Sequence, residues 1–165
     1  MHIEYYESGE PHLESEYKDG WKHGLEIRKW ESGATMHRGS YVMGKQQGEW
    51  QNWFSNGQLR SQITYRDGEP FGPRTLWHES GAVDTKLEER TREDGSKYLV
   101  QFGWHPNGQR SVEGQLYDEI GLSAEGIWRV WSERGNRDLE ASGVFVHGSI
   151  RKVRALTEEE WATSL

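Results

Sequence analysis

A glycine turn recurs at nearly constant intervals along this chain of 165 residues. Each copy has an aromatic residue three or four positions ahead of the glycine, and Ser or Asn stands just before it in five of the six copies. The turn glycines are Gly9, Gly33, Gly57, Gly81, Gly108 and Gly135, at steps of 24, 24, 24, 27 and 27 residues. Self-similarity at a fixed period is the signature of a repeat architecture. The spacing therefore predicts about six copies of one small unit.

Within a unit the packing residues alternate with polar ones, which is the period of a half-buried strand. Positions two, four, six and eight after the turn glycine are Leu59, Ser61, Ile63 and Tyr65 in the third unit, Pro11, Leu13, Ser15 and Tyr17 in the first, and Arg137, Leu139, Ala141 and Gly143 in the sixth. Asn-Gly or Asp-Gly pairs at 56–57, 67–68, 94–95 and 107–108 supply the positive φ angles of tight hairpin turns. We predict an all-β fold, an elongated antiparallel array of β-hairpin repeats of 24–27 residues stabilised by stacking, with Trp and Tyr side chains forming a ladder.

Two regions depart from this pattern. Residues 82–103 form a longer unit rich in charge, which predicts a hairpin protruding around Asp94-Gly95. After Gly148, Thr157 and Glu160 have the spacing of a helix capping box. We expect hairpin repeats over residues 1–148, and over 149–165 a tail with a short helical cap in which Trp161 covers the open end of the array.

Composition limits the possible functions. With 9 Trp, 7 Tyr and 4 Phe the chain has the rings to build a folded core. The absence of cysteine excludes disulfides and thiolate metal sites. The formal net charge of -7 argues against nucleic-acid binding, which requires a basic face. The acidic N-terminus does not resemble a signal peptide and the chain lacks an apolar run of about 18 residues, so we expect a cytoplasmic location.

The first unit also carries a family resemblance. Its pattern consists of Tyr5 to Gly9, then Tyr17 to Gly20, then His23-Gly24, and it resembles the MORN-repeat variant found in many bacterial proteins. The resemblance covers roughly residues 4–148. His23 is matched by Gln47 and Phe71 in the next two units, so the histidine is not required. The resemblance implies a β-hairpin array that holds another protein. Bacterial proteins built from this repeat include many that resemble antitoxins or immunity proteins, and related MORN repeats serve as membrane-associated scaffolds.

Motifs that would carry chemistry are weak. Residues 39–46 match the glycine and lysine spacing of a phosphate-binding loop, but Gln46 stands where that loop needs Ser or Thr, and Gly48 interrupts any following helix. His78 and His105 occupy the same repeat position, but a third metal ligand is missing. We therefore predict a non-catalytic protein with no catalytic residues, metal or cofactor.

The candidate partner-binding residues are Trp21 and four acidic residues of the longer unit, Glu88, Glu89, Glu93 and Asp94. Trp21 stands where the next units carry Lys45 and Glu69, and Trp is common among interface hot spots. The alternatives are that Trp21 caps the N-terminal end of the stack and that the acidic hairpin is simply solvated. Insertions in repeat arrays often lie on the binding face.

From these observations we expect a protein-binding repeat protein of the antitoxin or immunity type that occludes a basic toxin, since negative potential speeds association with a basic target. The alternative is a scaffold or membrane-surface module, which the net charge of -7 disfavours because anionic lipids repel it. Open strand edges leave both a monomer and an edge-paired dimer possible. The sequence does not identify the partner or the face that meets it.

Overall fold

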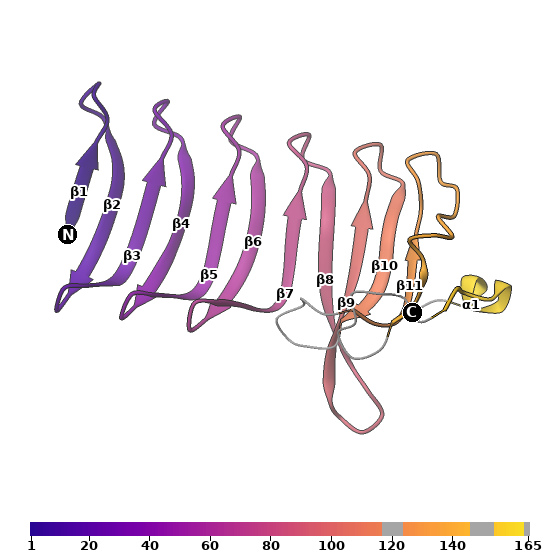
Figure 1. Cartoon of the computed structure of the whole chain (residues 1–165). Coiled ribbons are helices and arrows are strands. Elements are labelled where there is room, and N and C mark those ends of the chain that lie inside the picture. The colour runs from indigo at the N-terminus through magenta and orange to yellow at the C-terminus, as the bar shows by residue number, and fades with distance from the viewer. Residues whose placement is uncertain (117–123, 146–153, 164–165) are drawn as a thin grey trace. The chain divides into compact units, whose positions relative to one another are not determined.

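The computed structural model describes residues 1–116, 124–145 and 154–163. Within each of its compact parts, the strands form an antiparallel sheet of hairpins in which strands consecutive in sequence lie side by side (Figure 1). The strands are β1 (His2–Tyr5), β2 (Pro11–Lys18), β3 (Trp21–Lys29), β4 (Thr35–Val42), β5 (Lys45–Trp53), β6 (Leu59–Arg66), β7 (Glu69–Trp77), β8 (Val83–Thr91), β9 (Lys97–Trp104), β10 (Arg110–Leu116), β11 (Ala124–Val130) and β12 (Gly143–Phe145). One short helix, α1 (Glu158–Ala162), follows them. The predicted all-β hairpin repeat is confirmed.

The chain divides into two compact units. Unit 1 comprises residues 1–71 and 76–81, and unit 2 comprises residues 72–75 and 82–165. The predicted boundary at residue 148 lies outside the described residues.

Two turn chemistries alternate along the repeat. At one end of the hairpins of unit 1, Asp19, Met43 and Asp67 have φ angles of 50°, 49° and 53° and are followed by glycines that also have positive φ. Such pairs make the two-residue turns that match the twist of antiparallel strands. At the other end a three-residue loop closes on the turn glycine, as where Gly57 N–H donates to the Phe54 carbonyl at 3.0 Å. The glycine spacing therefore marks turns, as predicted.

In unit 1, one sheet face buries a close contact between a glycine and a tryptophan. A Cβ atom added at Gly39 would lie 2.1 Å from Cδ2 of Trp50, so only glycine leaves room for the indole. Trp50 is 3% exposed, and its Nε1 donates to the Ser40 carbonyl at 3.1 Å. Tyr41 and Tyr65 flank the indole at ring-centroid distances of 5.0 and 6.2 Å. This is a local form of the predicted aromatic ladder.

Unit 2 repeats the same arrangement. A Cβ atom at Gly114 would lie 2.1 Å from Cδ2 of Trp128, and the Trp128 Nε1 donates to the Gln115 carbonyl at 2.8 Å. The Trp128 ring packs against a buried cluster of Leu87, Leu99 and Leu116. Because strand side chains alternate between faces, these residues share one face of the sheet and leave Phe102 and Glu113 on the other.

The sixth unit contradicts the predicted strand pattern. Leu139 is 62% exposed, and Arg137 and Ala141 are exposed as well. The Asp138 Oδ1 accepts hydrogen bonds from the backbone N–H groups of Glu140 and Ala141, at 3.1 and 2.9 Å. Aspartate side chains stabilise turns in this way. The chain therefore turns here, and strand pairing resumes only at β12.

The predicted C-terminal helix is confirmed with its cap. The Thr157 side chain accepts from the Glu160 N–H at 3.2 Å, and Glu160 accepts from the Thr157 N–H at 2.9 Å, which is a complete capping box. Trp161 is 8% exposed and packs edge-on against Trp131, with the ring centroids 5.6 Å apart. The tryptophan therefore fastens a helix too short to be stable alone onto the sixth unit.

Candidate functional site

The predicted residue Trp21 begins β3 and is 58% exposed. Its ring lies against the next turn, since a Cβ atom at Gly44 would be 2.9 Å from Trp21 Cε3. The indole therefore packs against the turn of the next hairpin inside unit 1. Met43 in that turn is 50% exposed and has positive φ, an unfavourable conformation for a side chain of this kind. A role for Trp21 in partner binding stays a prediction.

The predicted acidic hairpin is formed by β8 and β9. At its turn, Asp94 accepts hydrogen bonds from the Ser96 side chain and backbone at 2.7 and 2.9 Å, and these bonds lower the pKa of Asp94. Glu89 pairs with Lys97 at 2.5 Å, and Glu93 is exposed. These contacts shape the turn, and Glu93 and Asp94 are exposed there. The contacts do not bring the four predicted carboxylates together, because Glu88 and Glu89 point to opposite faces of β8.

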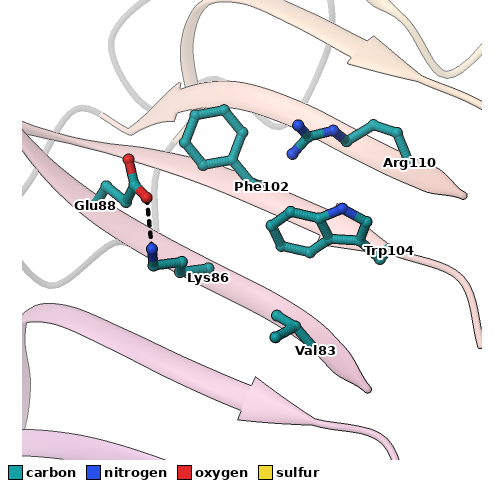
Figure 2. Close-up of a pocket in the computed structure, with 6 residues that line it drawn as sticks. All are labelled: Val83, Lys86, Glu88, Phe102, Trp104 and Arg110. Atoms are coloured by element: carbon teal, nitrogen blue, oxygen red, sulfur yellow. Dashed lines mark ion pairs between the residues drawn. The ribbon is translucent and has the colours of Figure 1, made fainter. Parts of the chain in front are cut away.

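Glu88 instead lines a hollow on unit 2, which we call the Arg110 pocket. It measures about 360 Å³ and lies over β8, β9 and β10. Its described lining residues are Val83, Lys86, Glu88, Phe102, Trp104 and Arg110 (Figure 2). Figure 2 shows the two rings and the guanidinium gathered on one side and the Lys86–Glu88 ion pair on the other. That ion pair measures 2.7 Å, and its hydrogen bond lowers the pKa of Glu88.

The Arg110 guanidinium is held by aromatic rings. Its Cζ lies 4.9 Å from the Phe102 centroid and 4.6 Å from the Trp104 centroid, both within cation–π range. A register shift between Arg110 and Val112 places Arg110 opposite Trp104. The Arg110 Nη1 is buried and lacks a hydrogen-bond partner. A buried donor without a hydrogen bond carries an uncompensated desolvation penalty, so an acceptor that binds to this N–H group would be stabilising.

The residues that line the Arg110 pocket are suited to binding a ligand. It combines an apolar lining from Val83 and two rings with one guanidinium that offers a fork of donors. Among the described residues there is no group of three side chains suited to a metal ion. None of the described helices could span a membrane, since α1 has five residues.

Sequence reasoning identified Glu88 but missed Phe102, Trp104 and Arg110. Trp104 was interpreted only as the aromatic residue of a repeat turn. The available signal was the spacing, because Phe102 and Trp104 are two residues apart and so lie on one face of a strand. Arg110 gave no comparable signal, since a one-residue register shift decides which ring it faces.

A second polar cluster lies in unit 1 and has a structural character. Glu26 is 3% exposed and accepts from Ser15 Oγ at 2.9 Å and from Lys22 Nζ, and it contacts His37 Nε2 at 3.1 Å. Burial by itself would raise the pKa of Glu26, but the bonds from His37, Lys22 and Ser15 lower it to about 2. Glu26 lies two residues after Gly24, as Trp50 does after Gly48. A satisfied carboxylate therefore replaces the buried indole of the next repeat.

Comparison with protein families supports the repeat assignment. The MORN repeat variant model matches residues 2–19 and 46–67, which cover the β1–β2 hairpin and most of the β5–β6 hairpin. Both stretches lie in unit 1, and the Gly114–Trp128 contact reproduces the Gly39–Trp50 contact in unit 2. No curated protein matches the chain. MORN repeats are non-enzymatic, so the match indicates a repeat-based binding module.

Proposed function

We propose that this protein is a non-catalytic binding protein of the antitoxin or immunity type, which captures a basic toxin in the cytoplasm and blocks it by occlusion. The observation that carries the binding role is the Arg110 pocket, in which a buried guanidinium N–H lacks an acceptor beside two rings. Arginine and aromatic side chains are enriched at the centres of protein interfaces.

The charge of the molecule supports a basic partner. The net charge of -7 attracts a cationic protein over long range and raises its association rate. Toxin antagonism rests on the resemblance of the repeat to bacterial antitoxin-type proteins. Direct catalysis by this chain is not part of the proposal.

The test is to recover the tagged full-length chain from its native cells at moderate salt and to express each co-purified protein alone. A stoichiometric basic partner that stops growth alone, and is harmless together with this chain, supports the proposal. Recovery of the chain with lipid and no protein favours the scaffold or membrane-surface alternative and overturns the antitoxin proposal.

Variants separate the predicted contacts. Trp21→Ala and Glu93→Lys test the two regions chosen from the sequence, and Arg110→Gln tests the pocket. Arg60→Gln is a matched control, because Arg60 also lies over a ring, that of Phe54 at 5.7 Å, but in unit 1 and outside the pocket. We expect Arg110→Gln to weaken capture and Arg60→Gln to leave it unchanged.

A further inference from the structure

Unit 2 contains two equivalent sets of repeat positions, 27 residues apart, in which the tryptophan and the following arginine recur and Phe102 is replaced by Arg129. Phe102, Trp104 and Arg110 correspond in the repeat to Arg129, Trp131 and Arg137. Trp104 pairs with Arg110 across two strands, and Trp131 pairs with Arg137 in the same antiparallel way. Glu113 pairs with Phe102 on one side and with Arg129 on the other, so both sets lie on one face of the sheet.

The second copy is contacted by the protein's own helix α1. The Arg137 Cζ lies 4.9 Å from the Trp161 centroid, and the Arg137 Nη1 donates to Glu158 Oε2 at 2.7 Å. The Arg129 Nε donates to the Glu160 carbonyl at 2.9 Å. The occupant of this copy therefore presents an aromatic ring and, three residues earlier, a carboxylate on the same side of a helical turn.

In the first copy the arginine lies over the rings of Phe102 and Trp104 instead, and among the described residues no carboxylate bonds to its Nη1. The Nη1 atom that is satisfied in Arg137 is buried and without a partner in Arg110. Among the described lining residues the other cation is Lys86, and it is already paired with Glu88. One singly charged anion would balance Arg110, whereas a doubly charged phosphate would find no second unpaired cation in that described lining and would face Glu88.

We propose that the Arg110 pocket binds a short acidic segment of a partner protein, in which an aromatic side chain enters the hollow and a neighbouring carboxylate pairs with Arg110. This deepens the proposed binding function and rests on it. The net negative charge of the chain attracts a basic partner from a distance, and the local contact of opposite sign fixes its register.

The experiment uses the full-length chain and a synthetic peptide with the sequence of residues 156–163, LTEEEWAT, as the probe. Binding is measured by calorimetry and by the NMR shift of the Trp104 indole N–H. We expect the peptide to bind and to shift this resonance. Peptides in which the tryptophan is replaced by alanine, or the residue matching Glu158 by glutamine, bind about tenfold more weakly because each loses one contact of the pair.

Protein variants locate the binding. Arg110→Gln and Val83→Phe both weaken peptide binding about tenfold, the first by removing the donor and the second by filling the hollow while Arg110 stays in place. Arg60→Gln and Arg137→Gln leave binding unchanged. Loss of binding in Arg137→Gln but not in Arg110→Gln means that the peptide exchanges with α1, and it overturns the proposal. Absence of any binding to the unmodified chain overturns it as well.

Failure here is distinguishable from failure of the proposed function. A chain that captures a toxin but ignores the peptide contradicts the ligand assigned to the pocket and leaves the antitoxin function standing. A chain that binds the peptide through Arg110 but captures no toxin contradicts the antitoxin function and leaves the ligand assigned to the pocket standing.

Discussion

At the scale of single residues, Met43 carries an avoidable conformational cost. Its φ of 49° lies in the left-handed region, where the two equivalent turns place Asp19 and Asp67. Asparagine and aspartate tolerate this region better than methionine because their short polar side chains bond locally. An exposed Met at this position, beside the exposed Trp21, therefore has no evident stabilising role in the turn.

We expect Met43→Asn to raise the free energy of unfolding by about 1 kcal/mol, because the strain of the turn is relieved. Chemical denaturation of the full-length chain measures the change. Val42→Asn is the control, since Val42 is also exposed but belongs to strand β4, where asparagine is unfavourable. A Met43→Asn variant less stable than the parent chain would contradict the strain argument.

The buried carboxylate of Glu26 makes stability depend on pH. Its pKa in the folded protein is about 2 against an ordinary value of 4.5, so the unfolded chain binds the proton more readily. The contribution of the Glu26 carboxylate to the free energy of unfolding is therefore fully present above pH 4.5 and is lost as the pH falls towards 2. The shift corresponds to a stabilisation on the order of 3 kcal/mol.

We expect Glu26→Gln to be less stable than the parent chain at pH 7 and to lose less stability between pH 4.5 and 2. Denaturation curves across that range measure both effects. Glu14→Gln is the control, because Glu14 pairs with Lys29 at 2.8 Å in a partly exposed site on the other face of β2. If Glu26→Gln and the parent chain lost the same unfolding free energy between pH 4.5 and 2, a group other than Glu26 would govern the acid sensitivity.

At the scale of elements, one pair of neighbouring strands in each unit is packed by a glycine that faces a tryptophan. The indole lies flat over Gly39 in unit 1 and over Gly114 in unit 2, where a Cβ atom would overlap the ring. Since a one-layer sheet has few deeply buried side chains, each such contact supplies much of the packing of its hairpin.

We predict that Gly39→Ala destabilises the chain by about 2–3 kcal/mol, because the added methyl group displaces Trp50 and its bond to Ser40. Thermal unfolding followed by near-ultraviolet circular dichroism measures the effect. Ser40→Ala alters the adjacent residue without entering the indole site and should cost far less. Equal losses in the two variants would mean that the glycine contact is not what holds the hairpins.

At the scale of the whole molecule, the net charge of -7 acts on any partner before contact is made. Screening shortens the range of this field, since the Debye length falls from about 30 Å at 0.01 M salt to about 3 Å at 1 M. The contacts in the Arg110 pocket are partly buried and are screened less.

We therefore expect the association rate of the captured partner to fall about tenfold as salt rises from low to physiological concentration, while the dissociation rate changes little. Stopped-flow or surface-binding kinetics separate the two rates. A triple variant, Glu89→Gln, Glu93→Gln and Asp94→Asn, should flatten the salt dependence if the acidic hairpin faces the partner. An association rate independent of salt would contradict electrostatic steering.

Much of the fold was predictable because its rules are local. Turn glycines and the capping box at Thr157 act over a few residues, and the structure confirms both of them. The prediction failed at residues 137–141, where the Asp138 side chain bonds to the backbone and forms a turn in place of the expected strand. One polar side chain there outweighs a weak alternation of Arg137, Leu139 and Ala141.

The candidate site was predictable only in part. Glu88 was selected as an acidic residue of the long hairpin, but in the structure it holds Lys86 at the edge of the Arg110 pocket. Glu89, Glu93 and Asp94 lie outside that pocket's described lining. Their charge was visible in the sequence, whereas their separation from Glu88 depends on strand parity and turn geometry.

The sequence alone determined the repeat, its antiparallel hairpins and its terminal helix, because period and turn chemistry are properties of neighbouring residues. The tertiary structure decided which side chains meet. Arg110 faces Phe102 and Trp104 because the register shifts by one residue in β10, and α1 contacts the equivalent arginine, Arg137, one repeat later. Strand register and helix docking depend on many contacts between residues that are far apart in the sequence. They therefore cannot be predicted from the sequence of a single repeat.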